Sequence, residues 1–370
     1  MIIDKIDALI RKIVMSKNWD IQATIIIFLI AHFVSFPSYN LQYENWSDQY
    51  EKSSKIFSNI EYGSGLSHKA KINVRITVPI LIKIFKLSPL GLILLKSSVG
   101  LIFIYLLLKM FSLILEDKYL AMLLTISCAF VGFGKVAVLE QRQIFDELSL
   151  MLVLASFLSR NFFIALLCLI SGFFNDERTL ITVFLFTLYF YQFNGQLKER
   201  EDNKYPYVVL VSIILFISGR LFMQLKLGIV APLDGVGFTT FLNQINAISL
   251  GYFMFLEGFW IIVLYPLYLY LNSKQNKPLF ILVGIYFMLG TLSSFLVIDH
   301  GRSIIYSYPV IFFGLSYLKE TINVKKMRNV IIATLVSCML IPTVGLGGKK
   351  SFWSYYSFPA QIMRMIFDRN

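Results

Sequence analysis

The stretch LGLILLKSSVGLIFIYLLLKMFSLI (90–114) decides the fold class of this chain. It is strongly apolar over more than the ~20 residues that a helix needs to cross the hydrocarbon core of a bilayer. Apolar runs recur along the whole chain, and they do not alternate as the ~10-residue strands of a membrane barrel do. Inside lipid, backbone groups must be satisfied within a helix or a closed barrel. We therefore predict an all-α, polytopic transmembrane helical bundle.

The composition supports this class. The chain has 370 residues, of which 57% are hydrophobic and only 15% charged, with a mean hydropathy of +0.69. A soluble domain of this length does not need so much apolar surface. We predict one integral-membrane domain over 1–370, no soluble domain, and the lipid bilayer as a partner. The net charge of +12 indicates basic loops that face anionic headgroups or ligands, and no nucleic-acid partner is expected.

We predict about eleven spans, within a range of nine to thirteen. The predicted spans are 20–37, 90–114, 119–136, 144–159, 161–175, 179–194, 206–224, 248–271, 279–298, 303–318 and 329–346. Residues 1–17 are predicted to form an amphipathic helix on the cytoplasmic membrane surface. Residues 38–89 form a large outer loop with interfacial helices, and one of these falls in the run 74–88.

The excess of Lys and Arg on one set of connections places the N-terminus in the cytoplasm. The same topology brings many ionisable side chains to the opposite face, where they could share one cavity. They are Glu44, Asp48, His68, Arg75, Glu140, Arg142, Asp146, Glu177, Arg178, Asp234, Asp299, His300 and Arg302.

These residue types suggest a reaction. Arg75, Arg178 and Arg302 offer planar donor forks suited to phosphate. Asp48 could accept a proton from an attacking sugar hydroxyl, and positive charge would stabilise a leaving phosphate. The parts fit the transfer of a sugar from a lipid-phosphate carrier. Glu177, Asp299 and His300 are predicted to complete the substrate and phosphate site.

Four short motifs then occur in order: NWSDQY (45–50), VRITVP (74–79), NDERTL (175–180) and DHGRSIIYSYP (299–309). The set resembles the GT-C class of integral-membrane glycosyltransferases, especially bacterial members of surface-polysaccharide clusters. It is also similar in size and topology to O-antigen and capsule polymerases.

The resemblance implies a catalytic acid in the first outer loop, matched by Asp48 with Glu44 as second choice. It implies a polyprenyl-phosphate-linked sugar donor and a glycan or lipid-linked acceptor. It also implies a bacterial inner (plasma) membrane with the active site on the periplasmic or extracellular side. The first loop lacks a clear Asp-Asp or Asp-x-Asp pair, so a divalent metal stays open as a cofactor and no metal ligand is assigned. His68 and His300 have no metal-ligand spacing.

Simpler interpretations stand beside these. Asp48 follows Asn45 in a pattern typical of a capping box, and Asp146 at the start of a span is also typical of a cap. Arg75 and Arg302 could snorkel to headgroups. Lys135 and Arg142 are expected to be headgroup anchors.

Other functions also remain open. One is a repeat-unit polymerase, and another is a lipid-linked saccharide transporter (flippase). A passive scaffold or an acyltransferase is a weaker alternative. A transporter typically has broken helices with charges near the midplane and inverted repeats. The sequence places its charges at span ends on one side and contains no detectable repeat, which favours the enzyme.

Overall fold

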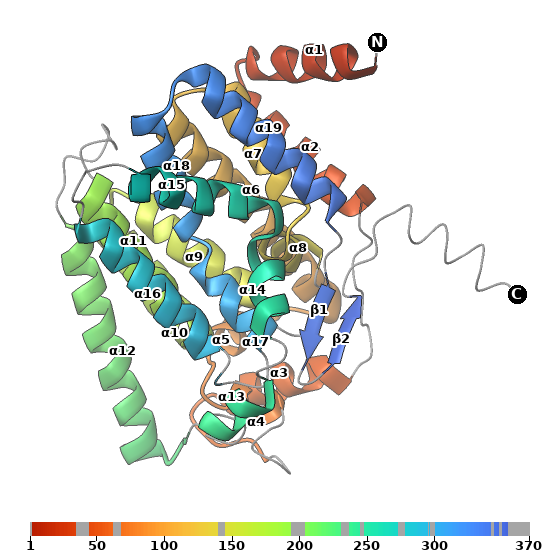
Figure 1. Ribbon diagram of the computed structural model, residues 1–370. Helices are drawn as coiled ribbons and strands as arrows, with labels where there is room; N and C mark the ends of the chain where they lie inside the picture. Colours follow the sequence, from red (N-terminus) through yellow and green to blue (C-terminus); the bar gives the residue numbers. More distant parts are fainter. Residues whose placement is uncertain are drawn as a thin grey trace, which may run out of the picture.

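The computed structural model describes residues 2–34, 44–61, 68–139, 145–193, 204–230, 237–244, 248–272, 278–294, 296, 300–341, 344–347 and 350–353. These residues are almost entirely helical, which confirms the predicted all-α class (Figure 1). A single antiparallel hairpin departs from it within the described ranges, with strand β1 (Val344–Gly347) paired to β2 (Lys350–Trp353).

Three helical stretches are long and apolar enough to cross a membrane. They are α6 (Pro89–Leu115), α12 (Tyr205–Leu227) and the stretch Ser249–Asn272. The last is built from α14 (Ile248–Leu256), a 3-10 helix at Glu257–Phe259 and α15 (Trp260–Asn272). The chain thus has the helices expected of a membrane protein.

The prediction of one continuous helical span over 119–136 is wrong. The structure has two helices there, α7 (Lys118–Cys128) and α8 (Gly132–Leu139), bent by 77° at the break. If the two helices together form one bent crossing of the membrane, they make a fourth candidate span. Gly134 explains the sharp bend, because a Cβ on it would lie 1.8 Å from the carbonyl oxygen of Cys128.

The remaining long segments are shorter helices that coincide with the predicted runs. They are α2 (Trp19–Val34), α9 (Asp146–Leu158), α10 (Phe162–Asn175), α11 (Thr179–Phe193), α16 (Pro278–Ser294), α17 (His300–Ile304) with a 3-10 turn at Ile305–Ser307, α18 (Val310–Thr321) and α19 (Val324–Leu340). All of these helices have fewer than the ~20 residues that fully cross a bilayer. The count of eleven crossings and the GT-C fold stay predictions.

Polar caps fix where these helices begin. Asp117 accepts hydrogen bonds from the backbone N–H groups of residues 119 and 120, Asn161 from those of 163 and 164, and Asn323 from that of Lys326. Such caps satisfy N–H groups that have no partner inside the helix. The connections before the caps at Asp117 and Asn161 are only a few residues long. Helices α6 and α7 therefore pack against each other, and so do α9 and α10. This antiparallel pairing brings distant sequence motifs to the same end of the bundle.

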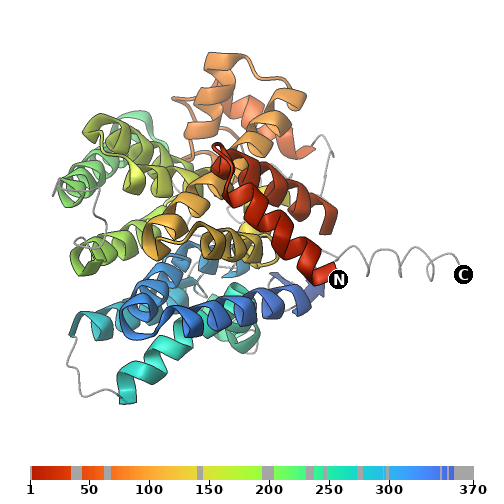
Figure 2. The same ribbon diagram turned by 90° about the horizontal axis from the view of Figure 1, so that it is seen from above.

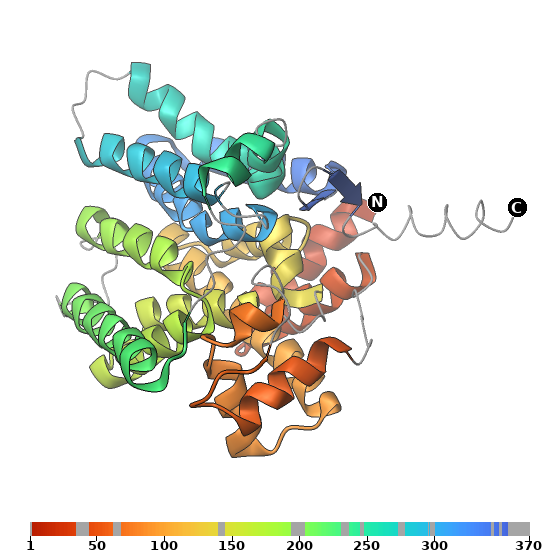
Figure 3. The same ribbon diagram turned by 90° about the horizontal axis from the view of Figure 1, so that it is seen from below.

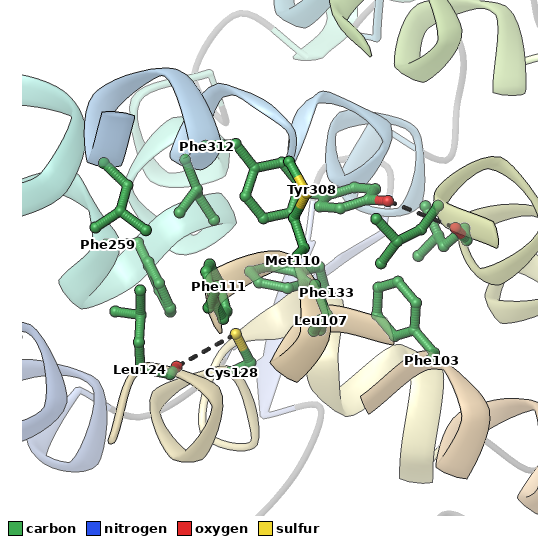
Figure 4. Close-up of a cluster of buried hydrophobic side chains, with 14 of the residues drawn as sticks. Phe103, Leu107, Met110, Phe111, Leu124, Cys128, Phe133, Phe259, Tyr308 and Phe312 are labelled. Carbon is green, nitrogen blue, oxygen red and sulfur yellow. Dashed lines mark hydrogen bonds between the residues drawn. The ribbon is translucent and has the colours of Figure 1, made fainter. Parts of the chain in front are cut away.

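Aromatic side chains fill the middle of the bundle (Figure 4). The ring of Tyr308 lies 5.7 Å from that of Phe133, 5.8 Å from Phe103 and 5.9 Å from Phe312, measured between centroids. All four residues are buried, and they come from α6, α8, α18 and the turn before α18. The edge-to-face contacts among them stabilise this packing.

Short helices cover the two ends of the bundle. Helix α1 (Ile2–Val14) lies across one end (Figures 1 and 2). Its Ile10 and Ile13 are buried while Lys5, Arg11 and Lys12 are exposed, as the amphipathic pattern predicts. Leu9, which belongs to the predicted apolar face, is exposed. At the other end lie α3 (Glu44–Ser54), α4 (His68–Ile72), α5 (Thr77–Phe85) and α13 (Phe238–Gln244) (Figures 1 and 3). That α1 and α5 lie on a membrane surface stays a prediction.

Candidate functional site

Six charged side chains converge at the end of the bundle that carries α3, α4 and α5. We call them the ionic cluster: Arg75, Asp146, Asp176, Glu177, Arg178 and Arg302. Arg75 precedes α5, Asp146 begins α9, and Arg302 belongs to α17. Residues 176–178 form the turn between α10 and α11.

Arg178 holds the centre of the cluster. Its Nε and Nη2 donate to the two oxygens of Asp176 over 2.8 and 2.6 Å. Nη2 also donates to Asp146 Oδ1 over 2.9 Å, and Nη1 donates to Ser303 Oγ over 3.0 Å. The guanidinium carbon lies 5.0 Å from the ring centre of Tyr306. The planar fork of an arginine suits such two-point pairing with a carboxylate.

Two further arginines complete the ion pairs. Arg75 contacts Asp176 Oδ2 at 2.9 Å and Glu177 Oε1 at 3.2 Å. Arg302 Nη1 contacts Asp146 Oδ2 at 3.3 Å. Asp146 therefore bridges two arginines, and it also accepts a hydrogen bond from the Tyr306 hydroxyl over 3.3 Å.

Burial divides the cluster into two layers. The side chains of Asp146 and Asp176 are only 2% and 1% exposed. Those of Arg75, Arg178 and Arg302 keep 13–14% of their surface exposed. The carboxylates of Asp146 and Asp176 thus lie inside. The accessible edge of the cluster is formed by the three guanidinium groups and by Glu177, whose side chain is 46% exposed.

The arginines keep the Asp176 carboxylate ionised. Burial opposes ionisation of Asp176, but the charges of Arg178 and Arg75 outweigh it and hold the pKa of this carboxyl well below its usual range. The pKa of Glu177 is also lowered, because Arg75 outweighs the cost of burial. Buried charges persist in proteins when they are paired and hydrogen-bonded in this way.

Neighbouring polar side chains fix the 176–178 turn to α9. Asn175 Nδ2 donates to the carbonyl oxygen of Phe145 over 2.6 Å and to Ser149 Oγ over 2.8 Å. The backbone N–H of Arg178 donates to Asp176 Oδ1 over 3.0 Å. Thr179 Oγ1 donates to the carbonyl oxygen of Gly172 over 3.1 Å. Hydrogen bonds to the flanking helices therefore hold the residues of the 176–178 turn in place.

A second, fully buried ion pair lies beside the cluster. Lys96 of α6 and Glu147 of α9 are 2.8 Å apart, and each side chain is 1% exposed. The Lys96 ammonium also lies 4.4 Å from the ring centre of Phe145, which contacts Trp46 of α3 edge-on at 6.2 Å. Helix α3 is thereby connected to the start of α9, next to Asp146.

The structure brings together four of the predicted site residues, Arg75, Glu177, Arg178 and Arg302. Asp48 lies in α3, where Lys69 and Glu51 are its charged neighbours and burial raises the pKa of its carboxyl. Within the described part of the chain, no hydrogen bond or ion pair joins Asp48 to the ionic cluster. Asp299 and the side chains of Glu44 and His300 lie outside the described residues.

Two residues in the cluster have roles that the sequence did not indicate. Asp146 was predicted to lie on the face of the shared cavity, with a helix cap as the simpler interpretation. Its carboxylate accepts from two arginines and a tyrosine. Asp176, in the motif NDERTL, is the main partner of Arg178 and Arg75. The signal that could have found both is the short connection between α9 and α10, which places the two acids at the same end of neighbouring helices.

Lys135 was expected to be a headgroup anchor, and that prediction is wrong. Its side chain is 4% exposed, and Glu257 is its charged neighbour. The 77° bend before α8 turns this part of the chain toward the 3-10 break that contains Glu257.

No group of three or more His, Cys, Asp or Glu side chains with metal-binding geometry occurs among the residues that the structure describes. A comparison with protein families, curated proteins and solved structures finds no match for this chain. The chemistry of the site therefore has to be inferred from its own residues. Partly exposed guanidinium groups, held in place by the buried side chains of Asp146 and Asp176, are suited to binding an anion of planar or tetrahedral shape.

Proposed function

We propose that the protein is a membrane glycosyltransferase of the GT-C type. It transfers a sugar from a polyprenyl-(pyro)phosphate carrier to a glycan or lipid-linked acceptor at the non-cytoplasmic face. The observation that carries the proposal is the ionic cluster, whose guanidinium edge could bind the phosphate of the carrier at one end of an apolar helical bundle.

The reaction needs a base and a stabilised leaving group. The acceptor hydroxyl oxygen attacks C1 of the donor sugar, and the bond between C1 and the phosphate oxygen breaks with its electron pair staying on the phosphate. Arg75, Arg178 and Arg302 stabilise the charge that develops there. Asp48 takes the hydroxyl proton, and the raised pKa of its carboxyl favours proton acceptance.

The packing of α3 supports this role for Asp48. Trp46, two residues earlier, is buried against Phe145, and Phe145 directly precedes Asp146 of the cluster. The candidate base and the phosphate-binding arginines are thus anchored to the same point of the fold.

The lengths of the helices support a site near the lipid headgroups. Helices α9 and α10 have 13 and 14 residues, or ~20 Å at about 1.5 Å per residue, against a hydrocarbon core of ~30 Å. Helix α12 continues past the cluster: Arg220 donates to the carbonyl oxygen of Val74 over 3.2 Å, and exposed apolar side chains follow it. They are Leu221, Phe222 and Leu225.

An apolar groove offers a surface for the carrier's hydrocarbon chain. It has a volume of about 320 Å³ and lies between α15, α16 and α18. Trp260, Leu264, Phe287 and Phe313 contribute to its walls. Helix α16 also packs against α17, which carries Arg302. A repeat-unit polymerase, which also takes polyprenyl-linked sugars, is kept as a form of the same proposal.

A specific observation favours a second candidate, a lipid-linked saccharide transporter. Transporters often bind their cargo at broken helices that carry charges inside the membrane. Here the chain breaks between α7 and α8 and again at Glu257–Phe259. The buried side chains of Lys135, in α8, and Glu257 are close enough for their charges to interact.

Complementation of a deletion strain tests the proposal. Asp48→Asn and Arg302→Ala should each abolish the surface glycan at normal expression, while Arg160→Ala, an exposed residue at the far end of α9, should restore it fully. Full-length glycan from both site variants would refute the catalytic assignment. A transferase mutant leaves a truncated or missing repeat unit, and a polymerase mutant leaves single repeat units. A transporter mutant accumulates complete lipid-linked units on the inner face.

A further inference from the structure

The end of the bundle opposite the ionic cluster carries exposed basic side chains. They come from the last turn of α1 and from the starts of α7 and α19, and α7 packs against both other helices. Figures 1 and 2 show α1 lying across this end of the bundle. We call these residues the basic surface: Arg11, Lys12, Lys118, Lys325, Lys326 and Arg328.

The ring of Tyr119 brings two arginines of this surface together. The guanidinium carbon of Arg11 lies 5.1 Å from the centre of the ring, and that of Arg328 lies 5.8 Å from it. The two arginines come from opposite ends of the chain, so only the fold places them at one ring. A guanidinium group that stacks on a ring keeps its N–H groups directed outward in its own plane, where they can still donate to a ligand.

Hydrogen bonds hold α1 in this position. The Tyr119 hydroxyl donates to Asp7 Oδ1 over 2.5 Å, and Arg11 Nε donates to Asp7 Oδ2 over 2.8 Å. Ile10 and Ile13, on the other side of α1, belong to the main buried hydrophobic cluster. The side chain of Arg11 nevertheless stays 51% exposed. The packed helix therefore presents this guanidinium group to its surroundings in a fixed place.

Exposed apolar side chains lie among these basic residues. They are Leu9 of α1, Met15 directly after α1, and Val324 at the start of α19. At the boundary of a bilayer, apolar side chains enter the acyl region while basic side chains meet the headgroup phosphates. The mixture of both kinds on one surface therefore favours a lipid membrane over a soluble polyanion as the partner.

We infer that the basic surface binds the phosphate groups of anionic phospholipids in the leaflet at this end of the bundle. In the predicted topology this is the cytoplasmic leaflet, whose lipids attract basic segments. The fork of an arginine binds phosphate through two parallel hydrogen bonds, and Tyr119 holds two such forks at one place. This lipid site is distinct from the ionic cluster and goes beyond the proposed sugar transfer.

Lipid retention by the purified full chain tests the inference. The chain is equilibrated in detergent with equal amounts of phosphatidylglycerol and phosphatidylcholine of the same acyl chains, and native mass spectrometry counts the bound lipids. The wild type should prefer phosphatidylglycerol, and high salt should weaken the preference. Arg328→Met should lower the ratio of the two lipids about fivefold and Arg11→Met with Arg328→Met about 25-fold, because each basic side chain near an anionic surface contributes ~1 kcal/mol.

Arg160→Met is the matched control. Arg160 is an exposed arginine in the connection between α9 and α10, at the same end of the bundle, so its loss removes one positive charge and leaves the basic surface intact. The ratio should not change. Unfolding temperatures show which variants are folded. Lys325→Gln with Lys326→Gln is a second test that leaves the contacts of Tyr119 in place, and it too should lower the ratio.

A wild type without a preference for phosphatidylglycerol would overturn the inference, and so would an unchanged ratio in the folded variants of the basic surface. An equal loss in Arg160→Met would show that overall charge, and not this surface, selects the lipid. Binding of glycerol phosphate or polyglutamate with no preference between the lipids would point to a soluble anion or an acidic protein and would also refute a lipid site. Sugar transfer is assayed separately, so its absence would leave this inference standing.

Discussion

The Nη2 atom of Arg178 donates to Asp146 Oδ1 over 2.9 Å, although the two residues lie 32 positions apart in the chain. This contact joins the start of α9 to the turn between α10 and α11. Arg302 Nη1 donates to the other carboxylate oxygen of Asp146 and so connects α17 to the start of α9 as well. The same side chains that could bind phosphate therefore also hold three parts of the bundle together.

Replacing Arg178 should destabilise the fold strongly. Arg178→Met would leave Asp146 and Asp176 with side chains 2% and 1% exposed and without their central partner. Removing one partner of a buried ion pair costs ~3–5 kcal/mol. We expect a clear drop in the unfolding temperature in detergent, and a smaller drop for Arg178→Lys, which keeps the charge but not the fork.

Arg160→Met is the control, because Arg160 is exposed. It should unfold within a degree or two of the wild type. An Arg178→Met variant as stable as this control would mean that the two acids are not held by Arg178 in the folded protein.

The buried pair Lys96–Glu147 predicts strong coupling between two positions. Lys96→Met and Glu147→Leu should each destabilise the protein by ~3–5 kcal/mol, because each leaves one charge buried alone. The double variant should be far more stable than the sum of the two changes, since apolar replacements of buried pairs are often neutral. Denaturation of all four proteins gives the coupling energy, and additive effects would argue against the contact.

The sequence predicted the convergence of Arg75, Glu177, Arg178 and Arg302 because loop charge and short turns fix which span ends share a face. It did not predict the roles of Asp146 and Asp176. An acid at a helix start has the same sequence signature whether it caps the helix or pairs with an arginine from elsewhere. Only the tertiary structure distinguishes a cap from an ion-pair partner: α9 packs against α10, and Arg302 of α17 contacts Asp146.

The fold likewise has a feature that the sequence did not predict. The apolar runs located the helices, but not the bend between α7 and α8 that buries Lys135. A hydropathy profile reports how apolar a run is and not whether it is continuous. The glycines at 132 and 134 were the only local sign of the break, and what decides it is the close approach of Gly134 to the carbonyl of Cys128.

The buried side chain of Lys52 predicts a pH dependence of stability. Burial lowers the pKa of Lys52 from 10.5 to about 8. Between these values the unfolded chain binds more protons than the folded chain at this position, so the free energy of unfolding should rise with pH. The gain should reach ~3 kcal/mol near pH 10.5 and vanish below about pH 8.

Unfolding in detergent across this pH range measures the effect. Lys52→Met should flatten the profile. Lys55→Met, a change of the exposed residue directly after α3, should keep the slope of the wild type. An unchanged slope in Lys52→Met would assign the pH dependence to other groups.

The close crossing of α15 and α18 depends on Gly314. A Cβ on Gly314 would lie 2.2 Å from the carbonyl oxygen of Ile262 and 3.0 Å from its carbonyl carbon. Small residues let membrane helices approach in this way, and backbone atoms cannot move aside as a flexible side chain can. Gly314→Ala should therefore lower stability by ~1–3 kcal/mol or more through overpacking.

Gly284 of α16 provides the comparison, because a Cβ there meets nothing within 4 Å. Gly284→Ala should be neutral or stabilise the helix by up to ~1 kcal/mol, since alanine has the higher helix propensity. The two variants add the same methyl group to glycines in neighbouring helices, so the difference between their unfolding temperatures isolates the helix crossing. Equal effects of the two changes would mean that α15 and α18 do not pack as closely as their backbones indicate.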